Sequence, residues 1–419
     1  MESSAATAPM TRSRFAELKG KPLAIFLAAF TAWTLSNMDQ SLFGYVVPAL
    51  IDDFGIGLDT IGLMISASFV FAIFSVTLIG ILADLWGRRL MLGLALGLSA
   101  LCVAAQAFMP NVFLLALMRI IGFGLGAGLS PITNALVAES SPPRFRSILM
   151  ALLQCAYPFG WFVASILVVP ILPAFGWRGT FMIAFAVVPV AYMLYRIIPE
   201  NTVYGAEAAL VGPKGLPLRE LAGPVYRRRA IFCALAFFVY GGATSGTTFY
   251  LPKFFQDVRG YEETTAALLV GGAYAVAMIG YVGGALVGNM VLGRRKTVVV
   301  WSWLGGLGIA LTTWLPQTVW QDFLIFGLTT IFFYGTSCVL TIYMVELFPT
   351  RLRATGAAVC GSAAVATGFS IFPILVAWSV GQVGWQWSFS TIIVPAMLLT
   401  GVFVLAIGDL PDVEDRPRA

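Results

Sequence analysis

The sequence predicts an all-α membrane protein with twelve transmembrane helices in two pseudo-symmetric bundles of six. Three observations support this fold class: an apolar composition, twelve apolar runs of membrane-spanning length, and a signature that recurs about 206 residues later. Hydrophobic residues make up 59% of the chain and charged residues 11%, whereas soluble domains average about 25% charged residues. A chain this apolar needs lipid around it.

Each apolar run is close to the ~20 residues that a helix needs to cross the hydrocarbon core. Backbone groups in lipid must be bonded within their own segment, so helices are expected, and the runs lack the alternation of barrel strands. The runs cover residues 22–50, 60–82, 90–110, 112–137, 147–173, 177–198, 230–251, 265–291, 297–315, 320–345, 356–380 and 387–408.

Several segments of the first half recur in the second half at a nearly constant offset. Gly87 and Gly293, each followed by two arginines, are 206 positions apart. The other matches are ESSPPRFR at 139–146 with ELFPTRLR at 346–353, and GWRGTF at 176–181 with GWQWSF at 384–389. Such an offset predicts duplication of a whole membrane half, which is common among transporters.

The predicted organisation is an N-terminal bundle (1–198), a cytoplasmic linker (199–229) and a C-terminal bundle (230–419). The linker is rich in glycine and proline, which interrupt regular structure. The chain has no histidine, and its five cysteines fall inside apolar runs without metal-ligand spacing. We therefore expect no metal and no cofactor, and any proton chemistry must use carboxyl groups.

The positive charges predict the orientation. Of the 25 lysines and arginines, 21 lie on one side of the predicted membrane, and Arg178, Lys253 and Arg259 lie on the other. By the positive-inside rule, both termini are expected to be cytoplasmic. We expect the protein to be a multi-pass component of a bacterial-type inner (plasma) membrane. The first run is too long for a cleaved signal peptide. The net charge of +5 reflects topology, so no nucleic-acid partner is expected.

Glycines mark three of the runs. The first run contains Gly44 and Pro48, and the seventh contains YGGATSG at 240–246. Interrupted helices at matching positions of two repeats indicate a gated binding site, although close helix packing also favours glycine. In the fourth run, the glycines at 122–128 have small-xxx-small spacing, which predicts close approach of another helix.

Only two charged residues, Asp39 and Arg119, lie well inside the apolar runs. At 1.5 Å per residue, Asp39 lies about 16 Å and Arg119 about 11 Å from the outer ends of their helices. The offset is about one helical turn, which an arginine side chain can span. Because a buried charge is costly and usually functional, we expect the two side chains to meet.

This pair suggests proton coupling. A guanidinium beside a buried carboxyl group favours the charged carboxylate, whereas burial alone favours the protonated acid. Protonation of Asp39 would release Arg119 to hold an anionic substrate group. Two alternatives remain: a static ion pair that fixes helix packing, and a sodium site that uses Asn37, Gln40 and Ser41 with Asp39. The nearby Arg119 would repel a cation.

Further polar and aromatic residues on these runs could shape a substrate cavity, although each is as compatible with packing as with binding. Together with Arg119, the candidate substrate-binding residues are Asn37, Gln40, Gln154, Tyr157, Trp161, Tyr240, Ser245, Tyr250, Tyr274, Tyr334 and Phe369.

Over essentially its full length the chain resembles the major facilitator superfamily. GILADLWGRR at 80–89 matches the family's motif G-x-L-A-D-x-x-G-R-R, and ELFPTRLRATG at 346–356 is similar to the branch of sugar porters and organic-acid:proton symporters. The resemblance implies a cytoplasmic charge network that stabilises the outward-open state and breaks on switching. Its residues are Asp84, Arg88, Arg89, Glu139, Arg146, Arg295, Glu346 and Arg353.

Two departures bear on the substrate. Sugar porters usually carry P-E-S-P-R after helix six and P-E-T-K-G after helix twelve, whereas this chain has PENT at 199–202 and LPDV at 410–413. The helix-five motif of drug antiporters, G-x-x-x-G-P-x-x-G-G, is replaced by YPFGW at 157–161. The first difference disfavours a sugar substrate, and the second disfavours drug efflux.

The sequence thus predicts a proton-coupled symporter that imports a small organic acid by alternating access. The alternatives are a proton-coupled sugar or polyol importer and, less favoured, a drug or metabolite efflux antiporter. No nucleophile, acid–base set or metal cluster converges, so we expect no enzyme. The expected partners are protons, a small-molecule substrate and the lipid bilayer, and the protein is expected to be a monomer.

Overall fold

The computed structural model describes residues 20–142, 144–198, 218–316 and 318–407, and within these ranges every regular element is helical. The helices are α1 (Lys21–Phe54), α2 (Leu58–Trp86), α3 (Arg88–Ala105), α4 (Val112–Ala127), α5 (Leu129–Ser140), α6 (Arg146–Gln154), α7 (Ala156–Met182), α8 (Val187–Ile197), α10 (Leu218–Leu221), α11 (Arg227–Thr248), α12 (Leu251–Arg259), α13 (Glu263–Met290), α14 (Arg294–Trp314), α15 (Val319–Leu347), α16 (Thr350–Gly356), α17 (Ala364–Ser388) and α18 (Val394–Ala406). Short 3₁₀ or π segments join some of them: η2 (Gln106–Phe108), η3 (Ile183–Ala186), η4 (Ala357–Ala363) and η5 (Phe389–Ile393).

Nine helical stretches in the described residues are long and apolar enough to cross a membrane. Two of them, Ile148–Ile197 and Ala357–Ala406, are 50 residues long, which at about 1.5 Å per residue is enough for two crossings each. Helix α1 is less apolar than these nine because its centre carries polar residues, but its 34 residues also span a bilayer. With both long stretches counted twice, these helices account for the twelve predicted crossings.

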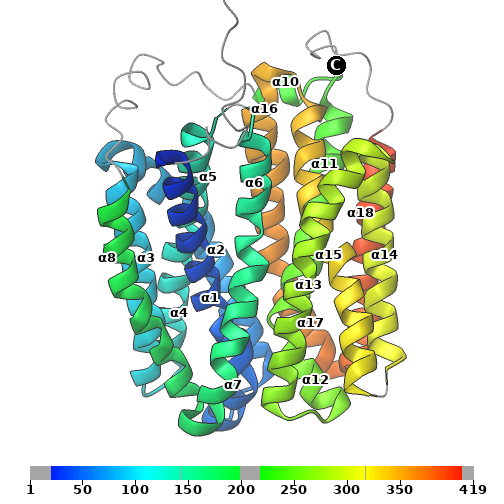
Figure 1. Ribbon diagram of the computed structural model, residues 1–419. Coiled ribbons are helices and arrows are strands. Elements are labelled where there is room, and N and C mark those ends of the chain that lie inside the picture. The colour runs from blue at the N-terminus through cyan, green and yellow to red at the C-terminus, as the bar shows by residue number, and fades with distance from the viewer. Residues whose placement is uncertain (1–19, 143, 199–217, 317, 408–419) are drawn as a thin grey trace, which may run out of the picture.

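Helices α1 to α8 lie together on one side of the molecule and α11 to α18 on the other (Figure 1). We call the face at which α1 begins and α18 ends the terminal face; α12 lies at the opposite face. Of the predicted linker, residues 199–217 lie outside the described residues. The remainder contains the one-turn helix α10, and α11 begins at Arg227.

Glycine allows the chain to reverse at equivalent points of the two halves. Gly176 (φ 65°) and Gly384 (φ 78°) interrupt the two 50-residue stretches, and Gly87 (φ 95°) and Gly293 (φ 76°) precede α3 and α14. Positive φ angles are strained for other residues. The repeated glycines of the sequence therefore mark repeated backbone turns.

The glycine-rich first and seventh runs pack closely and are not interrupted at their glycines. Helix α11 is continuous through Gly241 and Gly242, and a Cβ atom at either residue would overlap Val365 or Phe372 of α17. Helix α1 likewise continues through Pro48. The expected break in the seventh run comes only after Thr248, before α12 begins. Packing therefore explains these glycines directly.

The fourth run behaves as its small-xxx-small spacing predicts. It is divided into α4 and α5, and a Cβ atom at Gly124 or Gly128 would overlap Phe71 or Ile79 of α2. The absence of a side chain on this face allows α2 to approach closely. This contact helps to hold α4 and its single arginine at a fixed depth.

A close contact between α13 and α15 yields a stability prediction. A Cβ atom at Gly280 of α13 would overlap the backbone carbonyl of Ile331 on α15, whereas one at Gly283 would meet no atom within 4 Å. Overpacking costs about 1–3 kcal/mol, so Gly280→Ala should lower the apparent melting temperature in detergent by roughly 5 °C. Gly283→Ala is the matched control and should melt like the parent. Equal melting of the two variants would contradict the packing assignment.

Candidate functional site

The centre of the first half contains an arginine held among aromatic rings. Arg119 lies in α4, is 1% exposed, and donates from Nη1 to the backbone carbonyl oxygen of Gln40 at 3.0 Å. Its guanidinium carbon lies 4.5 Å from the ring centre of Phe43, 4.9 Å from Phe123 and 5.4 Å from Phe249. Rings at these distances attract a desolvated cation. The Nε and Nη2 groups have no hydrogen-bond partner among the described residues.

Asp39 lies beside this contact, one residue before Gln40 on α1. Its side chain is fully buried, and neither carboxyl oxygen has a hydrogen-bond partner in the described part of the chain. The side chains of Asp39 and Arg119, which we expected to meet, do not bond to each other: Arg119 bonds instead to the backbone carbonyl of Gln40, the residue after Asp39. A direct ion pair between them does not form in this conformation, because the guanidinium is held by that carbonyl and by the rings. Both groups therefore retain unused polar atoms.

An aromatic and hydroxyl cluster joins the two halves next to Arg119. The ring of Trp161 (α7) stacks on Tyr274 (α13) at 4.9 Å between centres and 22° between planes. The hydroxyl of Tyr274 lies 2.6 Å from that of Tyr334 (α15), which lies 3.0 Å from the Thr248 hydroxyl (α11). Phe249, which contacts Arg119, lies 5.4 Å from the Trp161 ring. A continuous set of contacts thus links the arginine to this cluster.

Three more of the predicted cavity residues border the cluster. The half-buried Tyr157 ring lies 6.4 Å from Tyr274 and 6.5 Å from Tyr334. The Tyr240 hydroxyl donates to the carbonyl oxygen of Phe333 at 3.2 Å. Across the interface, Phe369 lies 4.8 Å from Phe69 of the first half.

The remaining predicted cavity residues use their polar groups in bonds within the protein. Gln40 is among them and donates weakly to its own helix, at 3.3 Å to Ser36. Asn37 donates to the Trp33 carbonyl, and Ser245 donates to the Gly242 carbonyl. Gln154 donates to the Asn134 side chain, and Tyr250 donates to the Pro373 carbonyl. These four are less free than Arg119 to contact a substrate in this conformation.

The two halves meet closely on the side away from the terminal face. Gly62, near the start of α2, packs against Pro373 and Ala377 of α17, where a Cβ atom would have no space. Gly271 of α13 lies equally close to Ser165 of α7. With the stacked Trp161 and Tyr274 side chains, these contacts join the two halves between the central cluster and the opposite face.

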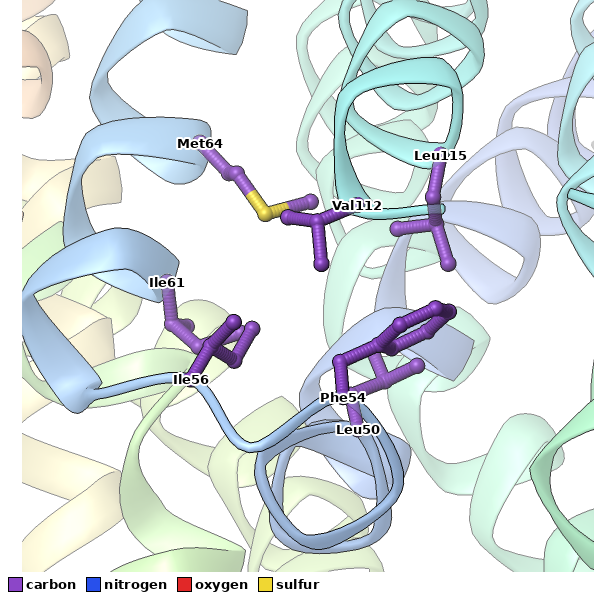
Figure 2. Close-up of a pocket in the computed structure, with 7 residues that line it drawn as sticks. All are labelled: Leu50, Phe54, Ile56, Ile61, Met64, Val112 and Leu115. Atoms are coloured by element: carbon purple, nitrogen blue, oxygen red, sulfur yellow. The ribbon is translucent and has the colours of Figure 1, made fainter. Parts of the chain in front are cut away.

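A small pocket near that face is not the substrate site. It lies between the ends of α1, α2 and α4, and Figure 2 shows that apolar side chains alone point into it. They are Leu50, Phe54, Ile56, Ile61, Met64, Val112 and Leu115. Such a lining offers no group that could recognise a charged or hydroxylated molecule.

Comparison with known proteins identifies the family. The model of the Major Facilitator Superfamily matches residues 25–364. The chain belongs to the Major Facilitator Superfamily. It is therefore a multi-pass membrane transporter and not an enzyme.

Sequence identity to individual members of the family is low. The chain is 25% identical to a niacin transporter of Acinetobacter baylyi over 78% of its own length and 80% of the relative's. It is 27% identical to a gentisate transporter of Corynebacterium glutamicum, over 87% of its own length and 83% of the relative's. Among solved structures, a D-xylose–proton symporter superposes with a TM-score of 0.74 at 17% identity, covering 93% of this chain and 99% of the other. This last likeness shows the shared fold alone.

The superfamily motif residues form ion pairs at the terminal face. Arg88 pairs with Glu139 and lies 3.7 Å from Asp84. In the second half, Glu346 pairs with Arg294, which the predicted network did not include. Each of these ion pairs joins residues of the same half, so they tie helices together within a bundle.

The other predicted network residues make local contacts. Arg295 donates to the Leu405 carbonyl at 2.8 Å, Arg89 to the Tyr195 carbonyl at 2.6 Å, and Arg353 to the Phe348 carbonyl at 3.3 Å. Arg146 is exposed at the start of α6. The first two of these bonds connect a motif arginine to the last helix of its own half.

Sequence reasoning missed Asp322, which lies at the edge of an apolar run near the start of α15 and is fully buried. Its carboxylate accepts from the Tyr261 hydroxyl at 2.7 Å and lies 3.4 Å from Nε of Arg259. Burial and this hydrogen bond raise the pKa of Tyr261 to about 12. The group sits near the opposite face, where it ties α15 to the chain between α12 and α13.

A second feature missed by sequence reasoning is a repeated contact at the same face. Asp53 accepts a hydrogen bond from the Trp177 indole at 3.2 Å, and Asp257 accepts one from the Trp385 indole at 2.8 Å. The repeated Gly-Trp pairs of the sequence were the available signal. Their partners lie more than 120 residues earlier in the chain and could not be identified from spacing.

Proposed function

We propose that the protein is a proton-coupled symporter that imports a small organic acid, and that the acid is an aromatic carboxylate. The observation that supports this most is Arg119, a buried guanidinium whose Nε and Nη2 atoms have no hydrogen-bond partner among the described residues, next to a cluster of aromatic rings. The named substrates of the two relatives above, niacin and gentisate, are both aromatic carboxylic acids.

The proposed recognition follows from the chemistry of the site. A carboxylate can accept two parallel hydrogen bonds from a guanidinium, and such charge-assisted pairs are strong in a desolvated site. The substrate ring would pack among Phe249, Trp161 and Tyr274. Hydroxyl groups on that ring would find donors and acceptors in Tyr334 and Thr248.

Asp39 is the proposed proton carrier. Burying a charged carboxylate without a partner costs several kcal/mol, whereas the neutral acid is far less costly to bury. The unpartnered Asp39 thus suits a carrier that takes up a proton before the site closes and releases it when the site opens to water. We assign the basic terminal face to the cytoplasm by the positive-inside rule. The close contacts between the two halves then lie toward the outside. The proposed transporter is a monomer in the inner membrane.

The rival substrate class is a sugar or polyol. The hydroxyl chain of Thr248, Tyr334 and Tyr274 favours it, because such groups bind sugar hydroxyls as readily as phenols. A sugar offers Arg119 no anionic partner, however, so its unpartnered Nε and Nη2 atoms would gain no hydrogen bond to a charged acceptor.

Transport by purified protein in liposomes tests the proposal. Initial uptake of labelled gentisate and nicotinate should exceed that of D-xylose, and an acidic exterior should stimulate it. Protein-free liposomes must be subtracted at every pH, because neutral aromatic acids also cross lipid unaided. Faster protein-dependent uptake of D-xylose than of both acids would reject the carboxylate assignment. Stimulation by a sodium gradient in place of a pH gradient would reject proton coupling.

A further inference from the structure

A cleft of about 400 Å³ opens at the terminal face of the second half, away from the central cluster. Its wall includes Arg294, Arg295, Lys296, Tyr343, Glu346 and Leu405. None of the predicted substrate-binding residues lines it. The proposed transport cycle gives this cleft no role in binding substrate.

The cleft has an excess of positive charge. Three consecutive cations begin α14, and the single carboxylate, Glu346, is already paired with Arg294. Gly293 precedes α14 without supplying a side-chain cap, so the first N–H groups of this 21-residue helix lack that partner. Basic side chains and an uncapped helix start both favour an anion.

Tyr343 provides an independent indication of a ligand. It lines the cleft but is only 2% exposed, and its hydroxyl has no hydrogen-bond partner in the part of the chain that the structure describes. Buried hydroxyl groups are nearly always hydrogen-bonded, because an unmade bond costs stability. An acceptor inside the cleft would satisfy this group.

The internal repeat shows which residues the fold itself needs. Arg294 and Arg295 correspond to Arg88 and Arg89 at the offset of 206. At the same offset Lys296 corresponds to a leucine, Leu90, and at the neighbouring offset of 207 Tyr343 corresponds to Leu136. The first half therefore builds the same turn without this cation and this hydroxyl.

The rim of the cleft indicates the source of the anion. Leu292 and Leu405, which border it, are 38% and 44% exposed, so apolar surface adjoins the charged groups. The cleft also lies where the apolar helices α14 and α18 reach the terminal face. A free phosphate would use only the charged part, whereas a phospholipid would use both.

We propose that this cleft binds the phosphate of an anionic phospholipid headgroup. Lys296 and the arginines attract the phosphate, Tyr343 donates a hydrogen bond to it, and the acyl chains lie against the rim leucines. Basic pockets between transmembrane helices are suited to such headgroups. The bound lipid would tie the start of α14 to α15 and α18.

Titration of the purified protein in detergent tests this site. Phosphatidylglycerol, phosphatidylcholine and inorganic phosphate are added separately, and binding is followed by native mass spectrometry and melting temperature. The variants Lys296→Leu and Tyr343→Phe each remove one polar group and install an apolar one. Each should weaken phosphatidylglycerol binding about tenfold, the loss of roughly 1.4 kcal/mol. Tyr343→Phe keeps the ring, so it remains informative if Lys296→Leu does not fold.

Arg144→Leu, which removes an exposed cation of the first half at the same face, is the control and should bind phosphatidylglycerol like the parent. Equal binding of phosphatidylcholine and phosphatidylglycerol by the parent would overturn the proposal, as would unchanged binding by both cleft variants. An equal loss in Arg144→Leu would show a general charge effect and also overturn it. Stabilisation by inorganic phosphate as strong as that by lipid would overturn the lipid assignment.

Discussion

Replacing Arg119 with glutamine is expected to abolish uptake of an aromatic carboxylate, with a fall in the initial rate of about 100-fold or more. Removing one partner of a buried, hydrogen-bonded charge pair typically costs 2–5 kcal/mol, and each 1.4 kcal/mol is a factor of ten. Arg119→Lys should recover little of this activity. Lysine keeps the charge but cannot offer the parallel donors that a carboxylate accepts from a guanidinium.

The measurement is gentisate uptake into liposomes together with direct binding to the purified variants. Arg119 also bonds to the Gln40 carbonyl, so the melting temperature of each variant must be reported to separate misfolding from loss of binding. Arg196→Gln removes an exposed arginine at the end of α8 and should transport normally. A folded Arg119→Gln variant that still binds gentisate tightly would exclude the proposed role.

The approach of Arg119 to α1 at a depth near that of Asp39 could be predicted from the sequence, because the rise of a helix is fixed and charges inside apolar runs are rare. The atoms that form the hydrogen bond could not be predicted. The guanidinium can choose between a carboxylate, a carbonyl and several rings, and that choice depends on rotamers and on Phe249 from the other half of the chain. Sequence spacing contains no information on these contacts.

The pairing of Glu346 with Arg294 was missed for a similar reason. Adjacent residues on a helix point about 100° apart, so only the rotation of α14 about its axis decides which arginine faces Glu346. The internal offset of 206 would have favoured Arg294, the counterpart of Arg88. A repeat thus predicts equivalent contacts better than a consensus motif does.

The largest omission from the sequence analysis was a buried charge near a helix end. Asp322 sits at the edge of an apolar run, where hydropathy alone suggests exposure to water. Its burial depends on Tyr261 and Arg259, which come from another part of the chain. The glycine positions, in contrast, were visible in the sequence, because positive φ angles and close helix contacts both restrict the residue type.

Replacing Asp39 with asparagine is expected to uncouple transport from the pH gradient. Asparagine has nearly the same size but cannot bind and release a proton, so an acidic exterior should no longer accelerate gentisate uptake. For the parent, two pH units supply about 2.7 kcal/mol per proton, enough for roughly 100-fold accumulation. Exchange of internal for external gentisate requires no net proton movement and should continue in the variant.

Both assays use the same liposomes, with protein-free liposomes subtracted because neutral acid crosses the lipid. Asp59→Asn removes an exposed carboxylate from the first turn of α2 and should retain the full pH response. Loss of both pH-driven uptake and exchange in a folded Asp39→Asn variant would assign Asp39 to binding or helix packing. Full pH-driven uptake by a folded Asp39→Asn variant would exclude Asp39 as the proton carrier.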